Sequence, residues 1–196
     1  MTPRDQLRRE LRYRRSIVPF AERERAAQQV ALHLVHSPWF RAARHIAVYL
    51  AIGGELDTQP TIKYAHAAGR HIYLPVITRD GRLSFHRWRP QAPMRRNRYG
   101  IMEPATASRH RLDAHALDLV LTPLVGFDPQ GNRLGMGGGF YDRTFAYQRL
   151  MRHWRYPPLV GLAYEFQEIQ MLQREPWDVP LAGIITPAGM RRFPST

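Results

Sequence analysis

Two apolar runs separated by a helix-like segment constrain the fold of this chain more than any other feature. Residues 45–52 have the sequence HIAVYLAI and residues 71–77 have the sequence HIYLPVI. Continuous apolar runs that contain β-branched residues are typical of strands covered on both faces. The segment between them begins near Asp57 or Thr58, which suit a helix N-cap, and ends near Gly69, which suits a C-cap. The pattern predicts a β–α–β unit with parallel strands and a right-handed crossover.

The rest of the chain continues this alternation of helices and strands. Helical patterns cover residues 3–15, 21–37 and 138–150. Further strand-like segments follow at 81–90, 117–127, 157–166 and 181–187. The segment 91–111 is a polar excursion that contains proline. We therefore predict a single α/β domain over 1–196, with a mainly parallel central sheet flanked by helices in a Rossmann-like, three-layer arrangement.

Composition excludes some kinds of site and favours one class of ligand. The chain has no cysteine, which excludes disulfides, thiolate catalysis and cysteine-ligated metal centres. Its 29 Lys and Arg residues against 16 Asp and Glu give a net charge of +13. This excess favours polyanions or phosphorylated ligands, and a generally basic surface is an equal alternative. Because no apolar run could span a bilayer and the charged N-terminus lacks the apolar core of a secretory signal, we expect a cytoplasmic protein.

The stretch RLGMGGGFYDR, residues 133–143, places four glycines within five residues between a predicted strand and a predicted helix. It follows DPQG, residues 128–131, whose composition is typical of a type I turn. Glycines let backbone amides converge on an anion, and a helix start adds partial positive charge. Arg133 and Arg143 could clamp phosphate oxygens, and Asp142 could hold a metal or stabilise the helix start. A structural glycine turn is the alternative, since neither a Walker A loop nor a dinucleotide fingerprint is present.

Three other residues are weaker candidates. Glu55 follows a predicted parallel strand, at the edge where open α/β sheets place ligands, and a solvated loop acid is an equal alternative. Arg4 and Arg8 lie four apart on a predicted helix and could reach a phosphate, although a solvated helix face is the commoner explanation. The nine histidines show no recognised metal-ligand spacing.

Together these segments resemble the 5-formyltetrahydrofolate cyclo-ligase family, also called 5,10-methenyltetrahydrofolate synthetases, over nearly the whole chain. The strongest match is GFDPQGNRLGMGGGFYDR, residues 126–143, which follows the central signature of the family almost residue for residue. Shorter matches are RDQLRREL near the N-terminus, GGELDT around Glu55, YGIMEP at 99–104 and WDVPLAGIIT near the C-terminus.

The resemblance implies an ATP- and Mg²⁺-dependent reaction. In it, 5-formyltetrahydrofolate is cyclised to 5,10-methenyltetrahydrofolate through a phosphorylated formyl group, an imidate phosphate, and ADP and phosphate are released. Such chemistry depends on alignment and charge neutralisation rather than on a protein nucleophile.

The resemblance also implies roles for individual residues. It implies Arg133, Tyr141 and Arg143 in catalysis and Asp142 as a ligand of Mg²⁺. The implied ATP-binding residues are Arg4, Asp5, Gln6, Leu7, Arg8, Arg133, Leu134, Gly135, Met136, Gly137, Gly138, Gly139, Phe140 and Tyr141. The implied folate-binding residues are Leu50, Glu55, Met136, Gly137, Gly138, Gly139 and Phe140.

Two departures from the family pattern concern charge. Some members carry a basic residue where Met136 stands and another at Gly138, so Arg133 and Arg143 would carry more of the phosphate contact. Some members also have an aspartate linked to Mg²⁺ where Ala182 stands, and Asp178 is the acid nearest to it in that motif. Water would take the coordination position of the missing aspartate, as it commonly does around Mg²⁺.

We expect a monomer whose partners are small molecules, namely the folate, ATP and Mg²⁺, with no nucleic-acid or membrane partner. The positive charge would raise encounter rates with ATP and with folates, which often carry polyglutamate tails. A basic nucleic-acid-binding module is the alternative that the charge supports, but the basic residues are scattered and no recognised motif appears. An α/β sugar-phosphate or CoA-type enzyme of similar architecture is a further alternative.

Overall fold

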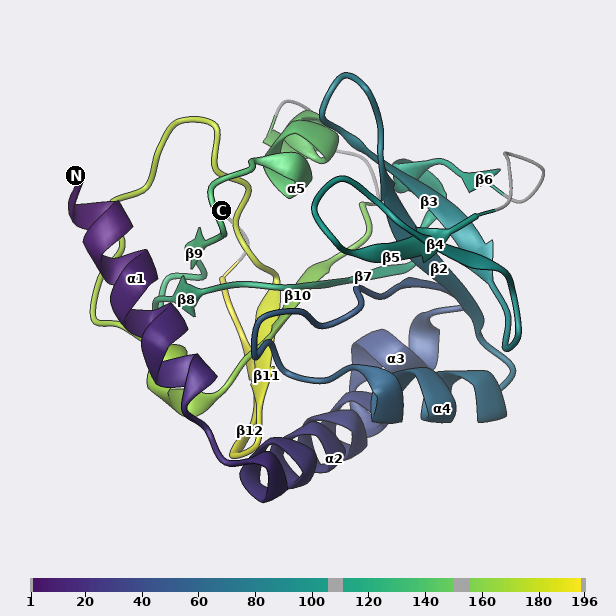
Figure 1. Cartoon of the computed structure of the whole chain (residues 1–196), viewed down its shortest axis with the longest axis horizontal. Coiled ribbons are helices and arrows are strands. Elements are labelled where there is room, and N and C mark those ends of the chain that lie inside the picture. The colour runs from purple at the N-terminus through teal and green to yellow at the C-terminus, as the bar shows by residue number, and fades with distance from the viewer. Residues whose placement is uncertain (1, 106–110, 150–155, 195–196) are drawn as a thin grey trace.

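A computed structural model describes residues 2–105, 111–149 and 156–194, and an eight-stranded mixed sheet forms its centre (Figure 1). The strand order is β12-β11-β10-β7-β1-β2-β3-β6. The central strands are parallel: β1 (His45–Ala47), β2 (His71–Ile77), β7 (Leu119–Thr122), β10 (Leu159–Leu162) and β11 (Gly183–Thr186). The outer strands are antiparallel: β3 (Leu83–Trp88), β6 (Arg111–Leu112) and β12 (Gly189–Arg192). The predicted α/β class with a mainly parallel central sheet is confirmed.

One face of the sheet is covered by three helices that lie together in Figure 1: α2 (Phe20–His36), α3 (Pro38–Ala42) and α4 (Gln59–Ala67). Val30 and Leu34 of α2 belong to one buried cluster with Ile46 of β1 and Leu121 of β7. This packing buries the apolar stripe of α2 and the inner faces of the strands, which is the main source of their stability.

The opposite face is covered by α5 (Phe140–Thr144), by a 3₁₀ turn at Ala146–Arg149 and by the segments around them (Figure 1). A second buried cluster lies on this face, and it includes Phe145 together with Phe85 of β3 and Val120 of β7. The two covered faces give the predicted three layers. Shorter 3₁₀ turns at Ala114–Ala116 and Glu165–Gln167 complete the connections.

Helix α1 (Pro3–Ser16) stands apart from the sheet and packs on a two-stranded hairpin (Figure 1). The hairpin consists of β8 (Gly126–Phe127) and β9 (Arg133–Leu134). Leu11 of α1 is buried with Leu134 of β9, and Leu7 packs against the same cluster. Between β8 and β9, the Gly131 amide donates to the carbonyl of Asp128 at 3.1 Å, which closes the predicted DPQG turn. Helix α1 is thereby fixed beside the segment that leads into the glycine stretch.

The predicted β–α–β unit is confirmed, with His45 opposite His71 in a parallel pair. Strand β1 is nevertheless shorter than the predicted run of 45–52. Val48 still donates to the carbonyl of Tyr73 at 2.9 Å, after which the chain leaves the sheet. The predicted strand over 117–127 is likewise divided into β7 and β8, because Pro123 has no amide hydrogen to continue a ladder.

Two other segments differ from the sequence prediction. The polar excursion contains a hairpin of β4 (Met94–Arg96) and β5 (Met102–Pro104), which the apolar pattern did not predict. The helix predicted over 138–150 is limited to α5, one 3₁₀ turn follows it, and residue 150 lies outside the described residues. Among the helices in the described parts of the chain, none has both the length and the apolar character needed to cross a membrane.

The order of the strands locates a crevice. After β1 the chain passes through α4 to β2, which lies next to β1 on one side within the sheet. Strands β7, β10 and β11 lie on the other side of β1. The order therefore reverses between β1 and β7, and the connections that follow these strands separate there. Open α/β sheets bind their ligands in such a crevice, outside the carboxyl ends of the strands.

Candidate functional site

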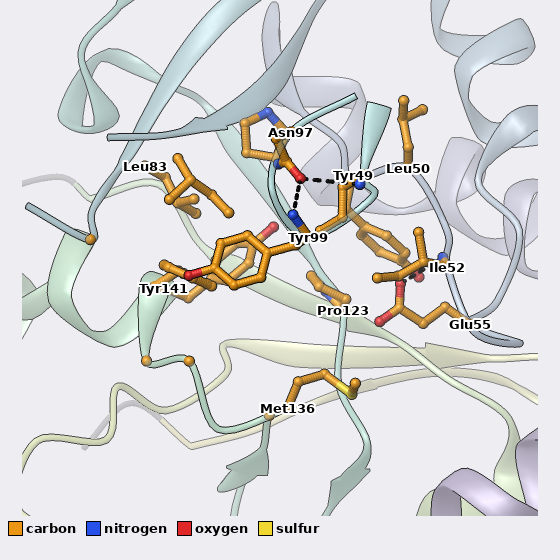
Figure 2. Close-up of a pocket in the computed structure, with 18 of the residues that line it drawn as sticks. Tyr49, Leu50, Ile52, Glu55, Leu83, Asn97, Tyr99, Pro123, Met136 and Tyr141 are labelled. Carbon is orange, nitrogen blue, oxygen red and sulfur yellow. Dashed lines mark hydrogen bonds between the residues drawn. The ribbon is translucent and has the colours of Figure 1, made fainter. Parts of the chain in front are cut away.

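A cavity of about 550 Å³ lies at this reversal point (Figure 2). We call it the first cavity. Its walls come from segments far apart in the sequence, and they include Leu50 and Glu55 after β1, Pro123 after β7, and Tyr141 in α5. Aliphatic and aromatic side chains predominate, with few polar groups among them, as is typical of sites for small organic ligands.

A second cavity of about 550 Å³ lies across the glycine loop, which we define as residues 135–139. Gly139, Asp142 and Arg143 line both cavities, so this segment separates them. Among the described residues, three arginines line the second cavity, namely Arg82, Arg143 and Arg149. This concentration of positive charge suits a phosphorylated ligand.

The backbone of the glycine loop needs glycine at two positions. Gly137 has a φ of 100° and Gly139 a φ of 61°, a region that residues with a side chain rarely adopt. Residues 136–138 are exposed, and within the described chain no backbone carbonyl accepts their amides, so these amides are accessible to a ligand. This availability favours the anion cradle over a purely structural turn.

Arginines hold the glycine loop by its carbonyl groups. Arg8 Nε donates to the oxygen of Gly135 at 2.9 Å, and Arg143 Nη2 donates to the oxygen of Gly138 at 2.5 Å. Arg143 Nε also donates to the oxygen of Gly81 at 2.8 Å. Arg8 and Arg143 therefore bring two positive charges to the loop. Helix α5, which follows the loop, has only five residues, and the positive charge predicted for its start stays a prediction.

Arg133 and Asp142 form a largely buried ion pair. Arg133 Nη2 and Nη1 lie 2.7 and 3.1 Å from Asp142 Oδ1, and the Val179 amide donates to the same oxygen at 3.0 Å. Arg133 Nη1 also donates to the carbonyl of Val179 at 3.3 Å. The arrangement fixes Asp142 by one oxygen, and no described residue donates to its Oδ2, which leaves that atom to a ligand.

The residues around Asp142 fit a Mg²⁺ ion bound through one protein carboxylate. Mg²⁺ commonly takes one or two carboxylates and completes its shell with water and phosphate oxygens. In the described ranges, no three His, Asp or Glu side chains gather as a metal site. Asp178 lines neither cavity, and its Oδ2 accepts a hydrogen bond from Arg4 Nη1 at 3.0 Å. Within the part of the chain that the structure describes, Asp80 is the other acidic residue that borders the second cavity.

Glu55 is buried at the end of the first cavity (Figure 2). Its Oε2 accepts the Ile52 amide at 3.1 Å, and its Oε1 lies 3.9 Å from Arg15 Nη1. Burial raises the pKa of Glu55, and the Ile52 amide and Arg15 only partly oppose that rise. Burial also raises the pKa values of Tyr49 and Tyr141, so both phenols stay protonated at neutral pH.

The loop of the β4–β5 hairpin forms a wall of the first cavity that sequence reasoning missed. Asn97 Oδ1 accepts the amides of Tyr99 and Ile101 at 2.9 and 3.1 Å, as Figure 2 shows in part. Asn97 Nδ2 donates to buried Glu103 at 3.3 Å. The ring of Tyr99 meets the ring of Phe140 edge-on, with centroids 5.7 Å apart. The YGIMEP match contained Tyr99 and Ile101, and that match was the available signal.

Most of the predicted site residues come together around the two cavities. Those that line the first cavity are Leu50, Glu55, Arg133, Gly135, Met136, Gly138, Gly139, Phe140, Tyr141, Asp142 and Arg143. Gly137 lines the second cavity. Their individual roles in binding and catalysis stay predictions.

The other predicted residues line neither cavity. Leu134 and Leu7 belong to the apolar contact between β9 and α1. Asp5 completes the capping box of α1 and accepts Arg8 Nη1 at 2.7 Å. Gln6 is exposed, and Arg4 is bound to Asp178. Contact of this N-terminal segment with ATP stays a prediction.

A cavity at the reversal point of an α/β sheet, bordered by a glycine loop and a buried carboxylate, defines the chain as an α/β protein built to bind small ligands. A family model described as the 5-formyltetrahydrofolate cyclo-ligase family matches residues 1–187. The chain therefore belongs to the 5-formyltetrahydrofolate cyclo-ligase family, and it is a ligase.

Relatives and solved structures agree with this assignment. The 5-formyltetrahydrofolate cyclo-ligase of Haemophilus influenzae is 39% identical over 186 residues, which cover 93% of this chain and 96% of the relative. The Escherichia coli protein of that name is 41% identical over 177 residues, 89% of this chain and 94% of the relative. The structure of Aquifex aeolicus 5,10-methenyltetrahydrofolate synthetase has a TM-score of 0.83 at 29% identity and covers 100% of this chain and 95% of its own.

Proposed function

We propose that this protein cyclises 5-formyltetrahydrofolate to 5,10-methenyltetrahydrofolate and converts ATP to ADP and phosphate with the help of Mg²⁺. The formyl oxygen takes the terminal phosphoryl group and ADP leaves. N10 then attacks the activated formyl carbon, loses its proton, and phosphate leaves. The observation that carries the proposal is the position of the glycine loop between two cavities, one largely apolar and one bordered by arginines. The names of the relatives support the folate as substrate.

The first cavity suits the folate. Its apolar walls match the flat faces of a pterin ring, and the Glu55 carboxylate lies buried at one end. An ionised carboxylate accepts hydrogen bonds from adjacent N–H groups, such as those on the aminopyrimidinone edge of a pterin. Leu50, Met136 and Phe140 supply apolar contacts in the same cavity.

The second cavity suits the triphosphate of ATP. Arg82, Arg143 and Arg149 border it, and the amides of the glycine loop are available beside it. Asp142 Oδ2 would hold Mg²⁺, which when bound neutralises phosphate charge. Asp142 and Arg143 border both cavities, which supports a role for them in the transfer of the phosphoryl group from ATP to the folate.

The chain contributes positioning and charge rather than a nucleophile. Arg133 keeps Asp142 in place through its ion pair, and Arg143 holds the loop through Gly138. The Tyr141 phenol is kept protonated by burial and is a hydrogen-bond donor at the boundary of the first cavity. Alignment of this kind is the main requirement of phosphoryl transfer.

The direct test is to mix the protein with 5-formyltetrahydrofolate and Mg-ATP and to follow the near-ultraviolet absorbance of the methenyl product. We expect absorbance to rise in the complete mixture, and to stay flat when ATP is omitted or when a chelator removes the metal. Folded protein that gives no ATP-dependent rise contradicts the proposal. Turnover that persists after chelation contradicts the metal requirement alone.

Replacement of Glu55 by glutamine should raise the KM for the folate about tenfold and leave the KM for ATP within about twofold, because it removes a charge-assisted acceptor from the first cavity alone. Initial rates with each substrate varied in turn measure this split. An equal rise of both KM values, or an unchanged folate KM, contradicts the assignment of Glu55 to the folate.

The affinity for the folate should also depend on pH through Glu55. Burial raises the pKa of its carboxyl, so lowering the pH protonates Glu55 before an exposed glutamate would be protonated. The folate KM of the native protein should therefore increase as the pH falls, and that of Glu55→Gln should stay flat over the same range. Parallel pH profiles for the two proteins contradict the role of Glu55 as an anion.

A further inference from the structure

Arg15, in the last turn of α1, is among the largest fully buried side chains of the protein, with 1% of its surface exposed. Its Nε donates to the carbonyl of Gly53 at 3.2 Å, and its Nη1 donates to the carbonyl of Leu124 at 3.2 Å. Gly53 follows β1 and Leu124 follows β7. The guanidinium therefore joins the two connections that separate at the reversal point of the sheet. Ile52 and Pro123, the chain neighbours of these two residues, line the first cavity.

We propose that Arg15 is a positioning residue for folate binding, which holds Glu55 in place as an anion at the end of the first cavity. The inference rests on the proposed function, because Glu55 is the residue through which it acts. Arg15 does not line the first cavity and needs no contact with the substrate.

The distances explain how Arg15 acts on Glu55 without forming a hydrogen bond to its carboxylate. Arg15 Nη1 lies 3.9 Å from Glu55 Oε1, which is too far for a hydrogen bond but near enough for charge attraction. Glu55 Oε2 is already bound to the Ile52 amide. The cation therefore favours the charged carboxylate and leaves Oε1 to accept a hydrogen bond from a ligand.

Among the described residues, Arg15 is the cation that acts on Glu55. The other titratable groups that interact with this carboxyl are Tyr49, from the segment after β1, and Tyr141, from α5. Both are protonated phenols at neutral pH, so they offer no positive charge. Without Arg15, the Ile52 amide would be left to oppose the effect of burial on the pKa of Glu55.

The backbone around Glu55 also depends on the end of α1. Gly54 has a φ of 78°, and a Cβ at that position would lie only 3.0 Å from the carbonyl oxygen of Arg15. The turn before Glu55 is therefore packed directly on the helix. About two helical turns earlier, Arg8 binds the glycine loop, so α1 supports both sides of the site.

The test compares Arg15→Lys and Arg15→Met with Arg12→Met, a control that removes an exposed arginine from the same helix. Lysine keeps the charge but lacks the planar fork needed to bind both carbonyls. We expect both Arg15 variants to raise the folate KM about tenfold and leave the ATP KM within about twofold. In Arg15→Met, the decline of folate affinity on the acid side should also start at a higher pH. Arg12→Met should behave like the native protein.

A double-mutant cycle separates action through Glu55 from a general loss of structure. In the Glu55→Gln background, Arg15→Lys should cause no further rise in the folate KM. If the two substitutions raise the folate KM independently, so that their factors multiply in the double variant, the proposal is overturned. A folded Arg15→Lys with a native folate KM and a native pH profile also overturns it. Thermal unfolding is measured for each variant. If Arg15→Met fails to fold, the outcome for Arg15→Lys decides the test. Native protein without turnover would refute the proposed function instead.

Discussion

Asp142→Asn should lower ATP-dependent turnover by about a hundredfold or more while the protein remains folded. Asparagine keeps a carbonyl oxygen that can accept from Arg133 and from the Val179 amide, so the contacts of Oδ1 are retained. It removes the negative charge of Oδ2, the carboxylate oxygen left to a ligand beside both cavities. Initial rates at saturating folate and ATP, over a range of Mg²⁺ concentrations, measure the loss.

Two further variants make this experiment specific. Asp142→Ala should also destabilise the fold, by about 3–5 kcal/mol, because it leaves the buried guanidinium of Arg133 without its partner. Asp113→Asn removes an exposed carboxylate that pairs loosely with Arg111, and both its stability and its turnover should stay native. A folded Asp142→Asn with turnover within tenfold of the native rate, and an unchanged dependence on Mg²⁺, would remove Asp142 from the metal site.

The fold could be predicted where the pattern of buried residues determines it. The strands β1, β2, β7 and β10 are covered on both faces, and such strands leave continuous apolar runs in the sequence. The β4–β5 hairpin leaves no such run. It is stabilised by the side chain of Asn97 and by the ion pair of Arg95 with Glu103, which depend on contacts made after folding. This hairpin brings Tyr99 and Ile101 to the first cavity.

The site could be predicted in part for a related reason. The density of glycine marks the loop in the sequence, and Glu55 follows a recognisable strand. The partners of the charged side chains were not predictable, because they lie far along the chain. Arg133 and Asp142 share Val179, which is 37 residues beyond Asp142, and Arg143 binds the carbonyl of Gly81. Arginines expected to clamp phosphate directly are thus also used to position the carboxylate and the loop.

Phe145→Ala should destabilise the fold by about 3–5 kcal/mol, which is the usual cost of removing a buried aromatic ring. Phe145 is fully buried at the end of α5, with ring centroids 6.0 Å from Phe85 and 6.1 Å from Tyr147. Because Phe145 is closely surrounded by other side chains, the cavity left by the removed ring should stay largely unfilled. For a protein of this size, the loss corresponds to a decrease in Tm of about 6–20 °C.

The same substitution should weaken folate binding. The ring of Tyr141 is stacked on that of Phe145 at an interplanar angle of 17°, with 6.4 Å between centroids, and Tyr141 lines the first cavity. We therefore expect a higher folate KM in Phe145→Ala at temperatures where the variant is fully folded.

Phe20→Ala is the matched control, because Phe20 is 68% exposed and the same deletion there should change stability by less than about 0.5 kcal/mol. Equal losses of stability in the two variants contradict the assignment of Phe145 to the core. A destabilised Phe145→Ala with a native folate KM would mean that Tyr141 keeps its position without the ring behind it.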